Sequence, residues 1–351
     1  MEITWSRVLS HSSYKDCVFS LCVSTDRLFV VGSDEHHGPG KMRYRAMAIR
    51  AIDGSDISTW VDDKTYPFAS LLTCTSYGDI IYALGATNEF WSILVFNRNL
   101  ELLRRVDIDN PRIIPFSTFT LYKYTDLYLY VAGTSVSADG STNAYVAKIS
   151  AMSLAIVGSA SITADSISSG ACAIGFNNAT KQVVIGGFVK TDKGLEWLIT
   201  FLNEDLKPLK IVKPGIPGSI TSISIDPSGY IYAIDYKTLA RITPDGRVES
   251  TIPLPSPSKI YTTQDKASPL APYVIVVTEN NIRVFSRTDL SEITTIRLFK
   301  EPHLIMPYPG SMDSVGDSLY VGLTRAESDT KYSWFILRLA PRSRRFTLFG
   351  R

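Results

Sequence analysis

The densest group of side chains that could bind a metal ion is a run of four adjacent residues, Asp34, Glu35, His36 and His37. Carboxylates and imidazoles are ordinary ligands of divalent metals. Side chains of adjacent residues rarely point at one ion, and this run leads into Gly-Pro-Gly, as a flexible polar loop would. The run therefore indicates either a metal site or, as we expect, a polar loop that contacts a partner.

Three further residues are candidates for contacts with a partner. Arg112 lies in "DNPRIIP", and His303 and Tyr308 lie in "EPHLIMPYPG". Arg112 could meet an anion or a partner carboxylate, because its guanidinium matches planar anions. Its alternative role is to bind backbone carbonyls, and the prolines around all three residues could serve only to stiffen the chain.

Familiar catalytic motifs are absent from the sequence. It contains no G-x-S-x-G, no H-E-x-x-H, no Walker loop and no G-x-G-x-x-G before a helix. Asp226 and Asp313 are the acidic exceptions in segments that are otherwise rich in Ser and Thr. We therefore expect no cofactor, although a divalent metal bound by these two carboxylates is an alternative.

The bulk composition favours a soluble globular protein. The chain has 351 residues, 45% of them hydrophobic, and a net charge of +2, which gives no general attraction to nucleic acid or acidic membranes. It has no apolar signal core and no uninterrupted apolar run of about 18 residues, so we expect a cytoplasmic protein without a membrane span. Four cysteines without a C-x-x-C pair suggest buried thiols. Two glutamines in the whole chain hint at a thermophilic source, although the low Glu count does not support that hint.

One short sequence motif recurs along the chain and predicts its architecture. It reads "GDIIYALG" at Gly85 and "DLYLYVAG" at Gly133, and related motifs end at Gly32, Gly187, Asp235, Thr278 and Leu323. Apolar runs are short and bounded by Gly, Asp, Asn or Pro, and no long helical periodicity occurs. Seven units of about 50 residues predict one all-β domain over residues 1–351, a seven-bladed β-propeller with four antiparallel strands per blade.

The motif fits the second strand of each blade, which is buried on both faces. The runs before it, such as "CVFSLCVS" and "SITSISID", are rich in small residues and suit strands around a narrow channel. Both "EITWSRVLS" at the N-terminus and "RRFTLFGR" at the C-terminus read as outer strands. We expect one of them to complete blade seven and so close the ring. The five tryptophans are expected to pack between blades.

Residues 218–255, "GSITSISIDPSGYIYAIDYKTLARITPDGRVESTIPLP", resemble a repeat of the NHL and streptogramin-lyase-like propellers. In those repeats "DPSG-x-IY" forms a hairpin and "ITPDG" ends the third strand. Residues 131–150, "VAGTSVSADGSTNAYVAKIS", are similar to another widespread propeller repeat. The resemblance implies the architecture. Lyase relatives place catalytic histidines close together near the channel, and this chain has four histidines without a His-x-His pair.

The loops suggest which face of the propeller binds a partner. Connections between second and third strands look long and polar in "SDEHHGPGK", "SVSADGST", "KTDKGLE" and "TRAESDTKY", and the connections between blades are rich in proline. Binding residues concentrate on long loops of a rigid frame. We therefore expect a non-catalytic scaffold that binds a protein partner on this face. The alternatives are a metal-dependent hydrolase or lyase at the channel mouth and, suggested by 18 tyrosines, a carbohydrate-binding module.

Overall fold

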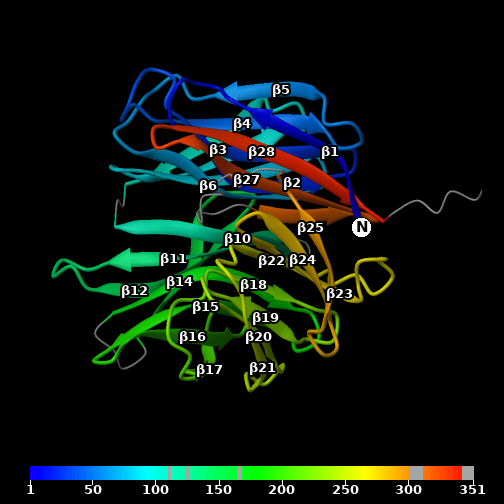
Figure 1. Ribbon diagram of the computed structural model, residues 1–351. Helices are drawn as coiled ribbons and strands as arrows, with labels where there is room; N and C mark the ends of the chain where they lie inside the picture. Colours follow the sequence, from blue (N-terminus) through cyan, green and yellow to red (C-terminus); the bar gives the residue numbers. More distant parts are fainter. Residues whose placement is uncertain (110–111, 124–125, 164–167, 300–310, 342–351) are drawn as a thin grey trace, which may run out of the picture.

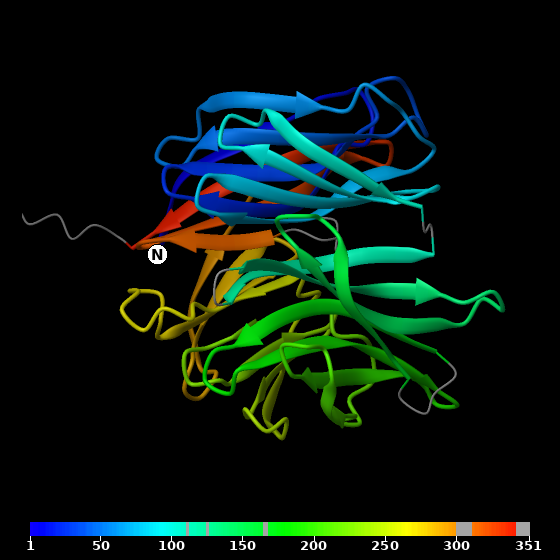
Figure 2. The same ribbon diagram turned by 180° about the vertical axis from the view of Figure 1, so that it is seen from behind.

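The structure is a computed structural model that describes residues 1–109, 112–123, 126–163, 168–299 and 311–341. Its regular structure is β throughout these residues and forms seven four-stranded antiparallel sheets arranged in a ring. Figure 1 and the view from behind in Figure 2 show these strands from two sides. The prediction of a seven-bladed β-propeller is confirmed. Within the described residues, no helix is long and apolar enough to cross a membrane.

The first strand of each blade borders the central channel, and the fourth lies at the outside. Blade 1 contains β2 (Cys17–Ser24), β3 (Arg27–Asp34), β4 (Arg43–Arg50) and β5 (Asp56–Val61). Blade 2 contains β6 (Ala69–Tyr77), β7 (Ile80–Thr87), β8 (Trp91–Asn97) and β9 (Leu102–Ile108). Blade 3 contains β10 (Ile113–Lys123), β11 (Asp126–Val136), β12 (Thr142–Ser150) and β13 (Ile156–Ile162). Blade 4 contains β14 (Ser168–Asn177), β15 (Gln182–Thr191), β16 (Gly194–Leu202) and β17 (Pro208–Val212).

The remaining three blades follow the same order of strands. Blade 5 contains β18 (Ser222–Ile225), β19 (Ile231–Ile234), β20 (Thr238–Ile242) and β21 (Val248–Pro253). Blade 6 contains β22 (Lys259–Tyr261), β23 (Tyr273–Thr278), β24 (Asn281–Ser286) and β25 (Glu292–Arg297). Blade 7 contains β26 (Ser311–Val315), β27 (Ser318–Ser328), β28 (Lys331–Ala340) and, as its outer strand, the N-terminal β1 (Glu2–Leu9).

The N-terminal strand therefore closes the ring. β1 pairs antiparallel with β28 from Glu2 opposite Ala340 to Leu9 opposite Trp334. Figure 1 shows the two strands side by side although they come from opposite ends of the chain. The expectation that one end completes blade 7 is confirmed for the N-terminus, and the C-terminal segment 342–351 lies outside the described residues.

The hydrophobic core is divided among the interfaces between blades. Seven buried clusters each join two neighbouring blades, and one of them joins blade 7 to blade 1. Trp91, Trp197 and Trp334 are fully buried in three of these clusters, near the start of a third strand. From outer strands, Trp60 packs against a fourth cluster, and Trp5 packs against the cluster that contains Trp334. The prediction that the tryptophans pack between blades is confirmed.

The upper face, defined here as the face that carries the second-to-third and inter-blade connections, is less elaborate than the sequence suggested. Residues 35–42 and 137–141 form real loops in blades 1 and 3. "KTDKGLE" and "TRAESDTKY" are instead strand ends, because only 192–193 separate β15 from β16 and only 329–330 separate β27 from β28. Continued hydrogen-bond pairing between the strands satisfies the backbone of these polar segments.

Candidate functional site

Asp34 is a structural ion-pair residue at the end of β3. Its side chain is completely buried, and both of its oxygens accept hydrogen bonds from arginines of β4. The Nε of Arg43 donates to Oδ1 at 2.8 Å, and the Nε of Arg45 donates to Oδ2. Burial alone would raise the pKa of Asp34, but the hydrogen bonds from the two arginines outweigh it and lower the pKa below its ordinary value.

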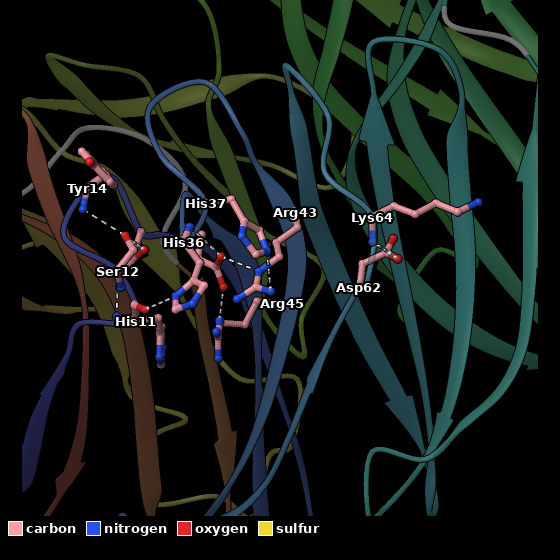
Figure 3. A network of polar contacts seen from close by, with 11 residues as sticks. His11, Ser12, Tyr14, His36, His37, Arg43, Arg45, Asp62 and Lys64 are labelled. Atoms are coloured by element: carbon pink, nitrogen blue, oxygen red, sulfur yellow. Dashed lines mark hydrogen bonds and ion pairs between the residues drawn. The ribbon is translucent and has the colours of Figure 1, made fainter.

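Glu35 anchors the loop that carries the two adjacent histidines. Its carboxylate is mostly buried and accepts hydrogen bonds from the backbone N–H groups of Lys15 and Gly40, each at 3.1 Å. His36 and His37 are exposed, and their rings meet edge to face at 5.3 Å. Figure 3 shows His36 directed toward the carbonyl of His11, and His37 beside Arg43. The run of four residues is thus divided between two buried anchors and two exposed rings.

His11 joins this group from the connection between β1 and β2, which the sequence did not predict. Its backbone carbonyl lies 3.2 Å from the Nδ1 of His36, and its ring packs edge to face on Trp334 at 4.8 Å. Burial, aided by the nearby Arg45 guanidinium, lowers the pKa of His11 to about 4. The imidazole is therefore neutral at neutral pH and acts as an apolar packing group.

The described residues contain no group of three or more His, Cys, Asp and Glu side chains that could hold a metal ion. Asp226 is buried in the hairpin between β18 and β19, where it accepts hydrogen bonds from Ser228 and Tyr230 and pairs with Arg287. Asp313 lies in β26 and accepts from the backbone of Val23 at 2.9 Å. The two carboxylates that the sequence pointed to are therefore engaged with different blades.

The other three predicted contact residues have different outcomes. Arg112 is exposed on the upper face, and its backbone carbonyl accepts a hydrogen bond from the N–H of Val136 at 2.8 Å. His303 and Tyr308 lie outside the described residues.

A β-bulge recurs in the inner strands of blades 1 to 4. The pairing register of each inner strand with the second strand skips one residue, and the skipped residues are Phe19, Leu72, Phe116 and Cys172. All four line a cavity in the channel. A bulge re-aims the side chain of its extra residue, and here it places large groups where the sequence predicted small ones.

The glycines of the recurring motif make these bulges possible. Gly32, Gly85, Gly133 and Gly187 each pair with the residue just before the skipped one. A Cβ on Gly32 would lie 1.9 Å from the Cys17 carbonyl oxygen, and one on Gly187 would lie 1.8 Å from the Gly170 oxygen. The inner strand can therefore approach only a residue without a side chain.

The bulged residues help to form an open cavity of about 640 Å³ at the upper end of the channel, called the upper cavity here. Its apolar wall includes Phe68, Ile114 and Phe116, and its polar groups include Lys15 and Lys259. Phe68 and Phe116 are each 39% exposed, and Tyr236, which also lines it, is 49% exposed. The ammonium of Lys15 lies 5.3 Å from the centre of the Tyr332 ring at the same rim.

A second cavity, of about 260 Å³, continues below it along the channel. Phe19, Leu72, Phe116 and Lys259 line both cavities, so the two follow one another. Burial raises the pKa of Asp313, on the wall of this lower cavity, to about 6. Burial lowers the pKa of Lys259 to about 8.

Nothing in the sequence singled out Lys259, Phe116 or Cys172. The Gly that ends the second strand in four of the seven repeats is the available signal, because a glycine inside a strand often marks a bulge or a close approach of backbone. Read in that way, it would have located a distorted inner strand opposite each glycine.

Comparison with known proteins supports the fold and leaves the family open. No family model matches the chain, and no curated protein matches it. Among solved structures, one similar chain comes from the "Crystal Structure of Mitotic Checkpoint Complex", with a TM-score of 0.63, 13% identity and coverage of 95% of this chain and 93% of that one. Another comes from the "Crystal structure of BBS1N in complex with ARL6DN, soaked with mercury", with a TM-score of 0.60, 12% identity and 97% coverage of both chains. In all, 722 chains match, and a fold so widely shared does not select a function by itself.

Proposed function

We propose that this protein is a non-catalytic propeller scaffold that binds another protein through the rim of the upper cavity. The observation that carries the proposal is the cluster of exposed aromatic side chains at one end of the channel, Phe68, Phe116 and Tyr236. Aromatic side chains are enriched at protein interfaces, and soluble proteins seldom gather exposed ones without a role.

The charges around the rim and the structural neighbours support the same proposal. Lys15 stands at the rim over the Tyr332 ring, so a partner with a carboxylate near its apolar contact would fit this surface. Both structural neighbours named above were solved as parts of complexes, according to their titles. The exposed His36, His37 and Arg112 of the upper face would then be peripheral contacts.

Affinity capture with matched surface variants tests the proposal. The bait is the full chain, exposed to extract of its own source, as the wild type, as Phe68→Ser/Tyr236→Ser, and as Tyr77→Ser. Tyr77 ends β6 on the opposite face and is 47% exposed, so it matches Tyr236 in type and exposure. We expect one stoichiometric polypeptide to be retained by the wild type and by Tyr77→Ser and lost from the rim variant.

Two results would overturn the proposal. One is that no polypeptide is retained at stoichiometric amounts by the wild type. The other is that retention survives the rim substitutions and is lost with Tyr77→Ser, which would place the partner on the opposite face. Circular dichroism of each variant shows whether a loss of retention reflects unfolding.

A further inference from the structure

The upper cavity is chemically divided into two halves. The bulged inner strands of blades 1 to 4 supply Phe19, Leu72, Phe116 and Cys172. The inner strands of blades 5 to 7 show no such shift in their described pairs, and this side supplies Thr221, Ser258, Lys259 and Thr324. One wall is therefore apolar, and the facing wall carries hydroxyl groups and an amine.

Lys259 is the charged group of the polar wall. It is the first residue of β22, it is mostly buried, and it borders both cavities of the channel. Within the described residues, its ammonium makes no hydrogen bond or ion pair, and the Cys172 thiol acts on its pKa only weakly compared with burial. A buried amine without an acceptor loses hydration without compensation, which is the cause of its lowered pKa.

The lining of the upper cavity contains two lysines and no carboxylate. An occupant that suits it has one negative charge for Lys259 and a carbon body for the apolar wall. A phosphate group is a poorer match, because phosphate sites present several converging N–H donors, whereas this wall offers one amine and a few hydroxyls. The volume of about 640 Å³ lies within the range typical of small-ligand pockets, roughly 300–1,000 Å³.

We propose that the upper cavity binds a small apolar monocarboxylic acid, whose carboxylate pairs with Lys259 while its carbon body packs on Phe19, Leu72 and Phe116. The occupant is a free small molecule, so the inference goes beyond the proposed function. It does not require the protein partner, because Phe19, Leu72 and Lys259 lie inside the channel and only Phe116 is shared with the rim.

Isothermal titration of the purified full chain with octanoate tests this site, because octanoate combines one carboxylate with an eight-carbon chain. We expect saturable binding of one octanoate per chain, and much weaker binding of 1-octanol and octylammonium. Lys259→Met should weaken octanoate binding by about ten- to a hundredfold, since it removes a charge-assisted contact in an apolar site. Lys207→Met, which replaces an exposed lysine that lines neither cavity, is the matched control and should change the affinity by no more than about threefold.

The pH dependence of the wild type gives a readout that needs no variant. An anion favours protonated Lys259, so octanoate affinity should be constant up to about pH 8 and fall above it, as that lysine loses its proton in the empty protein. The other titratable groups of the two cavities are Lys15, Cys17, Cys22, Cys74, Cys172, Tyr236, Asp313 and Tyr332. Burial raises the pKa of Cys17 to about 12, that of Cys172 above its ordinary value and that of Asp313 to about 6. The charges of these three groups therefore change little between pH 7 and 9.

A protection experiment supplies a second measurement on the unaltered chain. Cys172 shares the apolar wall, so octanoate should slow its alkylation by iodoacetamide, as read by mass spectrometry at that residue. The inference is overturned if octanoate does not bind at millimolar concentration, or if 1-octanol binds equally well. It is also overturned if Lys207→Met weakens binding as much as Lys259→Met does. None of these outcomes bears on whether the rim variants lose a protein partner.

Discussion

The residues that looked most like a metal site serve mainly to hold the upper face of blade 1 together. The carboxylate of Asp34 pairs with two arginines of the adjacent strand. The carboxylate of Glu35 accepts hydrogen bonds from the backbone of its own loop and of the connection before β2. The exposed His36 and His37 are thereby presented on a fixed loop. Their contribution to binding remains a prediction.

Asp34→Asn should therefore lower the free energy of unfolding more than the loss of an exposed ion pair does. The amide has the shape of the carboxylate but leaves the partly buried Arg43 and Arg45 without an anion. Breaking a buried charge pair on one side costs about 3–5 kcal/mol of unfolding free energy. Chemical denaturation measures the loss. The control is Asp53→Asn in the same blade, whose side chain is 50% exposed and pairs with Arg50, and it should have a much smaller effect because an exposed ion pair contributes little. Equal effects of the two variants would contradict the assigned role of Asp34.

The pH dependence of stability should report on Asp313. Burial raises its pKa in the folded protein to about 6 from 3.8, so between these values the folded state binds more protons than the unfolded state. Its contribution to stability is then present below pH 4 and is lost as the pH rises through 6. The amide of the Asp313→Asn variant does not ionise, so the stability of this variant relative to the wild type should increase between pH 4 and 7 by on the order of 2 kcal/mol.

Denaturation curves of both proteins at several pH values measure that difference. Replacement of an exposed carboxylate in the hairpin between β6 and β7 of blade 2, Asp79→Asn, serves as the control, and its curve should run parallel to that of the wild type. A parallel curve for Asp313→Asn as well would show that the carboxyl group of Asp313 ionises without penalty.

At the scale of elements, the glycine of the second strand and the β-bulge of the inner strand depend on each other. The second strand lacks a side chain at the point where the inner strand bulges, and the bulge carries a side chain into the channel. The same repeat that closes the ring thus builds the apolar wall of the upper cavity on one side. Blade 7 retains a glycine, Gly322, opposite Ser311, but its described pairs show no shift there.

Substitution of the motif glycine tests this coupling. In Gly187→Ala the new Cβ would lie 1.8 Å from a backbone oxygen, so the strands must separate, and we expect a loss of at least about 2 kcal/mol of unfolding free energy. Gly158→Ala in the outer strand β13 is the control, because its Cβ would meet nothing closer than 3.9 Å. It should be neutral or stabilising by up to about 1 kcal/mol, since alanine restricts the unfolded chain. A tolerated Gly187→Ala would show that the bulge does not need the glycine.

The sequence was sufficient to predict strands because their signals are local. Apolar runs bounded by Gly, Asp and Asn located the second strands, and the turns "NRNL", "NEDL" and "RTDL" located outer hairpins. Those turns hold Leu100, Leu206 and Leu290 buried at φ between 57° and 62°, a conformation that leucine seldom adopts and that sequence patterns do not reveal.

The site was harder to predict because its contacts are not local. Asp34 meets Arg45 across a hairpin, and Lys259 and Cys172 line one cavity from two different blades. Neither pairing leaves a trace in residue spacing. The loops of blades 4 and 7 were predicted wrongly for a related reason, since strand pairing of polar segments depends on the neighbouring strand more than on composition.

At the scale of the whole molecule, stability depends on a closed ring of interfaces. Each blade contributes to two of the seven buried clusters, so loss of one interface exposes two blade faces. The interface between blades 7 and 1 is covered by β1, whose Trp5 indole donates to the Ala51 carbonyl at 3.2 Å and whose Arg7 pairs with Asp56. The N-terminal strand thus belongs to blade 7 by pairing and is fastened to blade 1 by side chains.

Removal of residues 1–10 should therefore open the ring. The truncated chain exposes the edge of β28 and part of the cluster between blades 7 and 1, so we expect a lower melting temperature and a tendency to associate through the free edge. Thermal unfolding followed by circular dichroism, with size-exclusion chromatography, measures both effects. A synthetic peptide of residues 1–10 added in excess should restore the melting temperature in proportion to the logarithm of its concentration, because it binds the folded state. The same peptide with Trp5 and Arg7 replaced by alanine keeps the strand pairing but lacks the contacts to blade 1, so it should restore less. If the truncated chain unfolds at the same temperature as the full chain, or if both peptides restore it equally, β1 does not fasten blade 7 to blade 1.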